Sequence, residues 1–288
     1  MAENVYTGTV QGICVLGALD AEEGFCREIE GGSFSIDRHN IVKNGIGGQR
    51  HKRGGTLEAT LNLTCVGVSK THLAMWFPIA AGVQVTDFPD FGVQVYDGTT
   101  GQDWKLSDGQ PSSITISLDD APDAELTVEV EMKFATVAEQ TAGTYDPVYL
   151  TVKGHTHNDI GVTIGAASEG VLSFALSNDL GAAMYNPATT KSDDSKAFPD
   201  GYAYTKNDVK LDAVTSNALV TSLIDDLLTE VAIAIACANG TAGEDMTITM
   251  ATMSPDTFSM PVEVEGIVGF ATSFSPGDGT QYNQVVFT

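Results

Sequence analysis

The sequence is short of the residues on which several large classes of protein depend. Its 288 residues contain 14 lysines and arginines against 38 aspartates and glutamates, which gives a formal net charge of −24. A surface this acidic repels phosphate groups, so sequence-independent binding to nucleic acid and docking on anionic membranes are both disfavoured. No stretch approaches about 20 consecutive apolar residues, the length that a membrane-spanning helix needs.

Cysteine and histidine are scarce, and the common catalytic motifs are missing. The chain has four cysteines without a C-x-x-C pair, so buried free thiols are expected. His155 and His157 would share one face of a strand, as two metal ligands must, but no third ligand stands nearby and a polar loop is the favoured interpretation. The sequence contains no phosphate-binding loop, no H-E-x-x-H motif and no serine or cysteine nucleophile motif. We therefore expect a protein that is not an enzyme and that holds no cofactor.

The residues that are abundant indicate a mainly β protein. Hydrophobic residues make up 42% of the chain, which is enough for a folded core and too much for a disordered chain. The 30 glycines lie among many threonines, valines and serines. This composition is typical of many short strands joined by turns.

An internal repeat is the most informative feature of the sequence. Residues 113–136 resemble residues 246–272: Ile-Thr-Ile at 114–116 lies over Ile-Thr-Met at 248–250, and the two Val-Glu-Val-Glu runs align at the same offset of 134. Each copy predicts a strand, an acidic turn that contains proline, and a second strand, which together make a hairpin with a long loop. An offset near half the length indicates duplication of a whole domain.

Weaker similarities precede these hairpins. Residues 33–36 and 173–176 are strand-like runs, and each is followed by a long irregular segment, over residues 37–55 and 177–206. Further strands are predicted over residues 57–66, 209–214 and 231–236.

Each half also carries one helix signal. In residues 216–228, apolar residues recur at helical spacing after Ser216, which is a good N-cap. In residues 69–77, Ser69 can cap a shorter helix that Pro78 stops. A single helix must bury its apolar stripe against a sheet.

The expected architecture follows from these elements. The fold class is mainly β, with two tandem β-sandwich or small-barrel domains that each have one flanking α-helix. The polar, turn-rich segment 139–147 marks the boundary between them. The domains are expected over residues 1–140 and 141–288.

The Val-Glu-Val-Glu runs supply the first candidate surface. Because successive side chains of a strand point to opposite faces, the glutamates of each run share the face that the valines leave. An ordinary half-exposed strand is the alternative to a common acidic surface. The four glutamates are Glu129, Glu131, Glu263 and Glu265.

A basic stretch supplies the second candidate. Five of the 14 basic residues fall within 16 positions, and their charge opposes that of the rest of the chain. This pattern favours contact with an acidic surface of a neighbouring copy, with a solvated loop as the alternative. The five residues are Arg38, Lys43, Arg50, Lys52 and Arg53.

The layout of these segments resembles the tail tube protein of long-tailed, siphovirus-like bacteriophages. Most members of that family have one such domain and form hexameric rings; some carry two, and three chains then make a pseudo-hexameric ring. The resemblance implies a structural virion protein, made in the host cytoplasm, whose stacked rings form the tail tube through which DNA is ejected. The segments that carry it are 33–55, 69–77 and 113–136, with their counterparts 173–206, 216–228 and 246–272.

The resemblance also implies partners. The chain would bind other copies of itself, the tape measure protein and the tail terminator, and double-stranded DNA would pass without specific binding. The four glutamates are then expected to face the lumen, where they repel phosphate, and the basic loop 37–55 to contact the next ring.

Two alternatives stay open at this point. One is another virion β-sandwich, such as a capsid decoration or tail-tip protein. The other is a carbohydrate-binding β-sandwich, which needs an exposed aromatic platform. Trp76 is expected in the helix–sheet core, which leaves Trp104 as the candidate for such a platform.

Overall fold

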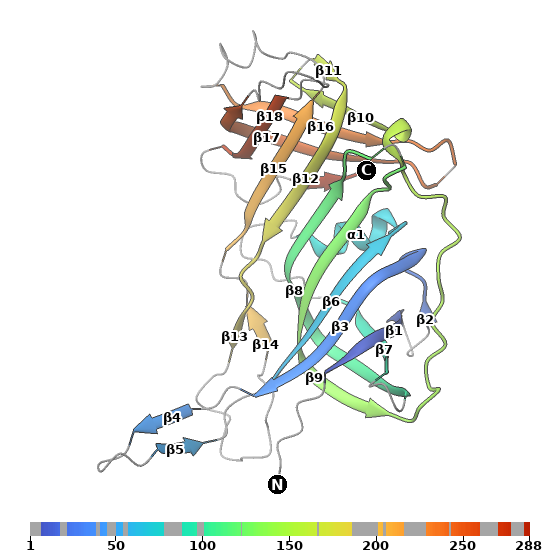
Figure 1. The fold of residues 1–288 in the computed structure, drawn as a ribbon, viewed down its shortest axis with the longest axis vertical. Coiled ribbons are helices and arrows are strands. Elements are labelled where there is room, and N and C mark those ends of the chain that lie inside the picture. Colours follow the sequence, from blue (N-terminus) through green and yellow to red (C-terminus); the bar gives the residue numbers. More distant parts are fainter. Residues whose placement is uncertain are drawn as a thin grey trace.

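The fold is that of a computed structural model of the chain. The model describes residues 7–17, 22–38, 41–44, 50–53, 57–77, 88–96, 101–121, 123–165, 167–185, 201–203, 206–215, 229–241, 243–259, 270–277 and 285–288. The protein is mainly β, as its composition predicted (Figure 1). The first half contains β1 (Thr7–Leu16), β2 (Glu22–Glu23), β3 (Glu28–Arg38), β4 (Ile41–Asn44), β5 (Arg50–Arg53), β6 (Leu57–Val66), α1 (Lys70–Trp76), β7 (Asp90–Tyr96), β8 (Gly101–Leu118) and β9 (Thr127–Gln140).

The second half repeats this succession of strands with some additions. A short 3-10 helix, η2 (His157–Asp159), precedes its first strand. Its strands are β10 (Ile160–Ile164), β11 (Ala167–Glu169), β12 (Val171–Asp179), β13 (Ala183–Tyr185), β14 (Gly201–Ala203), β15 (Asp208–Thr215), β16 (Val231–Cys237), β17 (Met246–Ser259), β18 (Phe270–Pro276) and β19 (Val285–Phe287).

One large sheet runs through both halves. Its strands follow the order β11-β10-β16-β17-β18-β15-β12-β8-β7-β1-β3-β6-β9, and β8 also pairs with β9, so that β8, β7, β1, β3, β6 and β9 form a closed ring of pairings. The order β3-β6-β9-β8 of the first half recurs as β12-β15-β18-β17 in the second. The pairing of β8 with β12 joins these two four-stranded units edge to edge. Eight strands therefore form one continuous curved layer.

The hydrophobic core follows this layer across the junction. Residues that pair in register from strand to strand are buried on the same face, so the apolar side of one unit continues into the other. Burial of such a row stabilises both units together, at about 25 cal/mol per Å² of apolar surface. The row runs through Cys65, Val128, Ile116, Leu176, Leu211 and Phe274.

Helix α1 confirms the prediction for residues 69–77. Ser69 is the N-cap, and its hydroxyl accepts a hydrogen bond from the backbone N–H of His72. Leu73 and Trp76 are fully buried, and the Trp76 ring packs edge-on against Phe25 with centroids 6.1 Å apart. The helix predicted over residues 216–228 lies outside the described residues.

The three short strand predictions are confirmed, but the long irregular segments are not. The predicted strands correspond to β6, β15 and β16. The segment 37–55 instead contains the end of β3 and the antiparallel hairpin β4–β5, and the segment 177–206 contains the end of β12 and the hairpin β13–β14. Both insertions are too polar or too short to show the alternation of a core strand, so composition alone did not predict them.

The first predicted hairpin is confirmed as β8–β9, and the second needs a correction. Pro255 and Asp256, which were assigned to a turn, lie inside β17, where the register with β18 shifts between Pro255 and Thr257. Proline has no N–H to donate, and a bulge tolerates it within a strand. The hairpin therefore turns after Ser259, and the predicted strand at residues 262–265 lies outside the described part of the chain.

The segment after β9 runs back along the first half before the second half begins. Leu150 N donates a hydrogen bond to Cys26 O over 2.8 Å, and Tyr145 N donates one to the Asp103 carboxylate over 3.1 Å. A Cβ on Gly92 would lie 2.8 Å from the Tyr145 ring, so glycine is required where this segment crosses β7. Residues 141–156 thus form a linker that is packed on the first half.

Candidate functional site

The outward face of the eight-stranded layer is lined by small polar and charged residues. On each strand these residues alternate with the buried row, and their registers continue from β3 to β15 without interruption. We call this surface the polar face. One row consists of Gly31, Thr64, Glu129, Thr115, Ser177 and Lys210, and the next consists of Ser33, Asn62, Glu131, Ser113, Asp179 and Asp208.

Two of the four predicted glutamates lie on the polar face. Val128 and Val130 are only 1% and 3% exposed, whereas Glu129 is exposed and Glu131 half-buried. The predicted alternation of this strand is therefore confirmed. Glu263 and Glu265 lie outside the described residues, and the location of all four in a lumen stays a prediction.

The polar face carries more carboxylates than amines. Its lysines are engaged in ion pairs: Lys133 Nζ lies 2.8 Å from Glu58 Oε1, and Lys210 Nζ lies 2.8 Å from Asp212 Oδ2. The Lys210 pair is half-exposed and contributes little to stability, whereas the Lys133 pair is largely shielded from water. Both pairs neutralise positive charges of the surface. The acids along the described part of the polar face are Asp37, Glu58, Asp119, Glu129, Glu131, Asp179, Asp208 and Asp212.

The polar face is hollowed at two places. A concavity of about 470 Å³ lies over β3, β6, β9 and β8 and is lined by Ser33, Asn62 and Glu131 among others. A smaller one of about 260 Å³ lies over β8, β12, β15, β18 and β17 and includes Ser117, Asp212 and Ser273. Both hollows open on the polar face and present hydroxyl, amide and carboxylate groups there.

The junction between the halves combines a strand pairing with a further backbone hydrogen bond and a packed hairpin. β12 and β8 pair over six residues each, and Leu180 N donates a hydrogen bond to Ser112 O over 2.9 Å. The β13–β14 hairpin, which extends from β12 and β15, then crosses to the first half, where Ala182 and Tyr202 pack against Ala135 of β9. Burial, with a smaller contribution from the nearby carboxylate of Glu58, raises the pKa of Tyr202 above its usual value.

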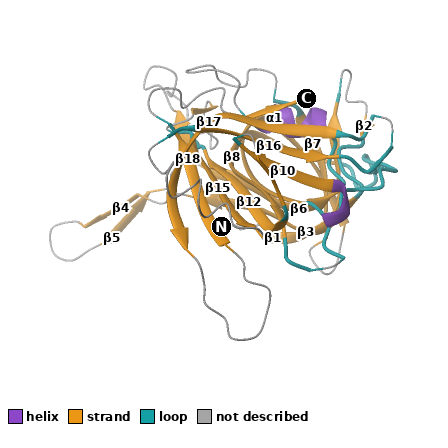
Figure 2. Cartoon of the chain, turned by 90° about the horizontal axis from the view of Figure 1, so that it is seen from above, coloured by secondary structure: helices purple, strands orange, loops and turns teal. Residues whose placement is uncertain are grey.

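The basic stretch coincides with the β4–β5 hairpin. Lys43 lies in β4, Arg50, Lys52 and Arg53 lie in β5, and Arg38 ends β3. The hairpin forms a separate two-stranded sheet that projects from the rest of the protein (Figure 2). Its contact with the next ring stays a prediction.

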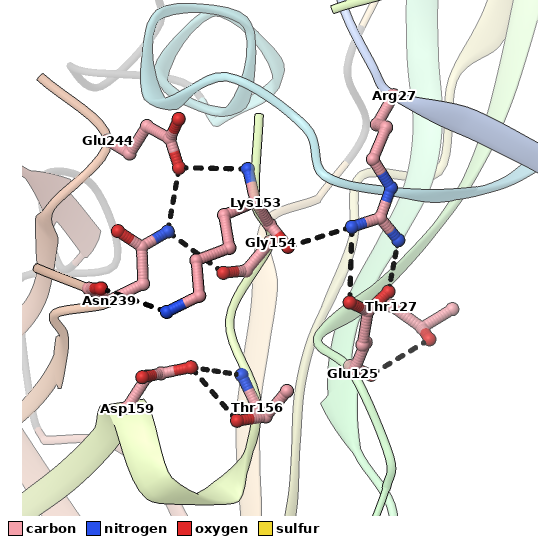
Figure 3. Close-up of polar contacts among 9 residues, drawn as sticks. All are labelled: Arg27, Glu125, Thr127, Lys153, Gly154, Thr156, Asp159, Asn239 and Glu244. Carbon is pink, nitrogen blue, oxygen red and sulfur yellow. Dashed lines mark hydrogen bonds and ion pairs between the residues drawn. The ribbon is translucent and has the colours of Figure 1, made fainter. Parts of the chain in front are cut away.

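Arg27 ties the linker to the first half (Figure 3). Its guanidinium binds both carboxylate oxygens of Glu125, and Nη1 also donates to Lys153 O over 2.8 Å. The hydrogen bond to Glu125 raises the pKa of Arg27. This fork holds the linker where it leaves the first half.

A second set of contacts ties the linker to the second half. Asn239 Nδ2 donates to Gly154 O over 2.9 Å and to Glu244 Oε2 over 2.7 Å, and Glu244 in turn accepts from Lys153 N over 3.0 Å. Asp159 accepts from the backbone N–H and hydroxyl of Thr156, and the backbone bond is the main reason why its pKa is lowered. The linker is therefore fixed to both halves within a few residues.

The histidine pair does not form the arrangement expected of metal ligands. His155 forms part of no extended strand, and His157 begins η2 with its Nε2 2.5 Å from Leu172 O. Burial lowers the pKa of His155. Within the described ranges, no group of three or more histidine, cysteine, aspartate or glutamate side chains is placed to hold a metal ion.

The cysteine prediction is confirmed, and the aromatic platform is not found at its candidate residue. All four cysteines are free and buried, and burial raises the pKa of Cys14 and of Cys237 to about 12. Trp104 is 7% exposed and packs against Phe34 at 5.7 Å between ring centroids. It therefore offers no exposed ring to a sugar.

Comparisons with known proteins identify no relative. A scan against protein-family models gave no match for the chain, and a search of curated proteins also found no match. None of the described helices combines the length and the apolar character that crossing a membrane requires.

Proposed function

We propose that this chain is a structural virion protein that polymerises into stacked rings and forms the tail tube of a long-tailed bacteriophage. The observation that carries the proposal is the pairing of β8 with β12, which joins two four-stranded units of the same order edge to edge. On this proposal, the chain contains two tandem tube domains, and the β8–β12 pairing is an example of the contact that neighbouring domains make in the ring. Three chains then supply six units around a ring.

The remaining edges of the layer support ring closure. Strand β17 pairs with β16 along one edge as far as Met253 and with β18 along the other edge. From Ser254 to Ser259, the edge that β16 occupies earlier has no partner strand among the described residues. At the other end, β3 pairs with β1 only at Ser33–Ser35, which leaves Ile36–Arg38 without a described partner on that edge. Open edges of this kind must be paired or covered, and pairing between copies does so.

The chemistry of the polar face supports a passage for DNA. A surface whose acids outnumber its lysines repels phosphate, and the serine and threonine hydroxyls that line its hollows offer no aromatic surface on which bases can stack. At physiological ionic strength the repulsion extends about 8 Å, so it acts as a short-range wall. DNA would pass such a wall without binding to it.

The proposal includes the location and partners of the protein. It is a component of the virion tail, assembled from copies of itself, with the tape measure protein inside during assembly and a terminator at the end of the tube. It performs no reaction and requires no cofactor.

Native mass spectrometry and electron microscopy of the purified protein test the proposal. We expect rings of three chains with pseudo-sixfold symmetry, or tubes of constant bore built from them. Six chains per ring would contradict the duplicated-domain assignment. A protein that stays monomeric at all concentrations would contradict the tube and favour a decoration protein instead.

A further inference from the structure

We infer that the β4–β5 hairpin of one chain packs on β17 and β18 of a second copy in the same ring, at the site of Asp256 and Ser275. The inference rests on the proposed ring, names a contact that closes it, and assigns the basic hairpin to this contact instead of the contact with the next ring that the sequence predicted. It concerns a hairpin that projects from the protein (Figure 2) and a surface on which Asp256 is exposed and Ser275 half-buried.

The chain contains a template for this contact. The β13–β14 hairpin extends from β12 and β15, crosses the junction and contacts β8 and β9 of the neighbouring unit. Its anchor is Tyr202, only 3% exposed, which packs with Ala182 against Ala135. A hairpin at this place therefore reinforces the strand pairing between two adjacent units.

The β4–β5 hairpin occupies the same place in the first half. It extends from β3 and β6 as β13–β14 extends from β12 and β15, and Val42 pairs with Lys52 as Met184 pairs with Tyr202. The unit that it would reach is the one beyond Ile36–Arg38 of β3, which have no described partner strand on that edge. In a ring, that unit is the second half of the next copy.

The strand registers identify the matching surface. Phe34 pairs with Leu61 in the first half as Phe174 pairs with Ala213 in the second. Two residues further along, Ala59 pairs with Phe134, and the corresponding residue Leu211 pairs with Phe274. Ala135 therefore corresponds to Ser275, the residue after Phe274. The strand registers thus relate β9 to β18 at an offset of 274 − 134 = 140, which corrects the offset of 134 that the sequence repeat predicted.

The surface at Ala135 is apolar and so is the β13–β14 hairpin that covers it, whereas the surface at Ser275 is acidic and the β4–β5 hairpin is basic. Apolar Ala135 is covered by a hairpin whose strands read Ala-Met-Tyr and Gly-Tyr-Ala. At the uncovered counterpart, the Ser275 hydroxyl donates to Asp256 Oδ1 over 2.9 Å, and Asp256 is exposed. The hairpin available for it carries Lys43, Arg50, Lys52 and Arg53.

Charge complementarity supports a second copy as the occupant. Residues 38–53 contain five basic residues and no acidic ones, so their net charge is +5 and that of the remaining chain is −24 − 5 = −29. A hairpin this basic is attracted to other copies of an otherwise acidic chain and is repelled by their own basic hairpins. The attraction both guides association and fixes which surfaces meet.

Charge reversal of the hairpin tests the inference. In the variant with Arg50→Glu, Lys52→Glu and Arg53→Glu, we expect rings to be lost at protein concentrations where the wild type forms them, with unchanged circular dichroism. The matched control, with Arg50→Lys, Lys52→Arg and Arg53→Lys, keeps the charge and is expected to form rings. Adding Asp256→Lys to the reversed variant is expected to restore part of the assembly.

Cross-linking between copies provides an independent measurement. A chain with Lys52→Cys is mixed with a chain with Ser275→Cys and oxidised, and we expect a disulfide-linked pair of chains within rings. Complete rings from the reversed variant that fail to stack would overturn the inference and place the contact between rings. Wild-type rings without the Lys52→Cys to Ser275→Cys cross-link would also overturn it and leave the proposed tube intact, whereas a wild type that never assembles would overturn both.

Discussion

The two halves of the protein contain the same four-stranded unit, but the edge strand β3 of the first half and its counterpart β12 of the second have different partners. In the first half, β1 pairs with β3 through Thr7–Thr9, and the pairings close on themselves. In the second half, β10 pairs with β16 and β11, and β12 pairs with β8 of the first half. The edge of β3 or β12 can therefore pair either with a strand of its own half or with a neighbouring unit. A sheet unit with that choice can be assembled into longer layers without a change of fold.

Breaking the shared core at the junction is expected to have the largest effect. Leu176 is fully buried in the row that crosses from β8 to β12, so Leu176→Asp places a charge among apolar side chains. We expect a loss of about 3–5 kcal/mol in the free energy of unfolding, as for other buried unpaired charges. Urea titration followed by circular dichroism measures it.

A matched variant and the tryptophans sharpen this test. Ser177→Asp adds the same charge one residue away on the polar face and is expected to change stability by less than about 0.5 kcal/mol. Trp76 and Trp104, the two tryptophans of the chain, both lie in the first half. If Leu176→Asp left the tryptophan fluorescence transition unmoved, the halves would unfold independently and the junction would not couple them.

Releasing the linker is expected to have an intermediate effect. Arg27→Ala removes the fork to Glu125, which is partly shielded from water, and the exposed hydrogen bond to Lys153 O. We expect a loss of about 1–2 kcal/mol, since bonds to charged groups are the stronger ones but solvent screens this pair in part. Proteolysis between residues 141 and 156 should accelerate, whereas Lys210→Ala, which breaks an exposed ion pair on the polar face, should leave cleavage unchanged.

Acidification is expected to weaken the contacts at the linker by a smaller amount. Burial lowers the pKa of His155, against the opposing effect of Asp159, Glu244 and Asp245. The native protein therefore resists protonation of a group that the unfolded chain protonates below about pH 6.5. Stability is fully present above that pH and falls as the pH decreases toward the lower native pKa. His155→Gln should flatten this part of the stability profile, and an unchanged profile would show that other groups cause the loss.

Changing the polar face is expected to affect stability least and transport most. Glu129 and Glu131 project from β9 away from the core, so Glu129→Lys with Glu131→Lys should leave the unfolding midpoint and the rings unchanged. In the proposed tube, this change turns repulsion of phosphate into attraction, so DNA ejection from assembled virions should slow, with relief at high salt. Extension of the change to Glu263 and Glu265 should increase the defect if they share the lumen, and unaltered ejection would contradict the lumenal assignment.

Several local features of the fold were predictable because they depend only on residues that are close together in the sequence. The alternation of Val128, Glu129, Val130 and Glu131 predicted which side chains are buried, and Ser69 predicted the start of α1. The similarity of residues 33–36 and 173–176 indicated that β3 and β12 occupy equivalent places. Periodicity and capping act within one or two turns or strands, so they can be recognised without knowing where the chain goes next.

The sequence by itself thus determined β6, β15, β16, the hairpin β8–β9, the first helix and the buried thiols. The tertiary structure decided which edges meet: β12 on β8, the linker on Arg27, and Pro255 within β17 rather than in a turn. An unpaired backbone edge makes the same hydrogen bonds with any strand of suitable twist, so no local pattern of side chains specifies its partner. That choice depends on side chains far apart in the sequence that become neighbours only when both halves have folded.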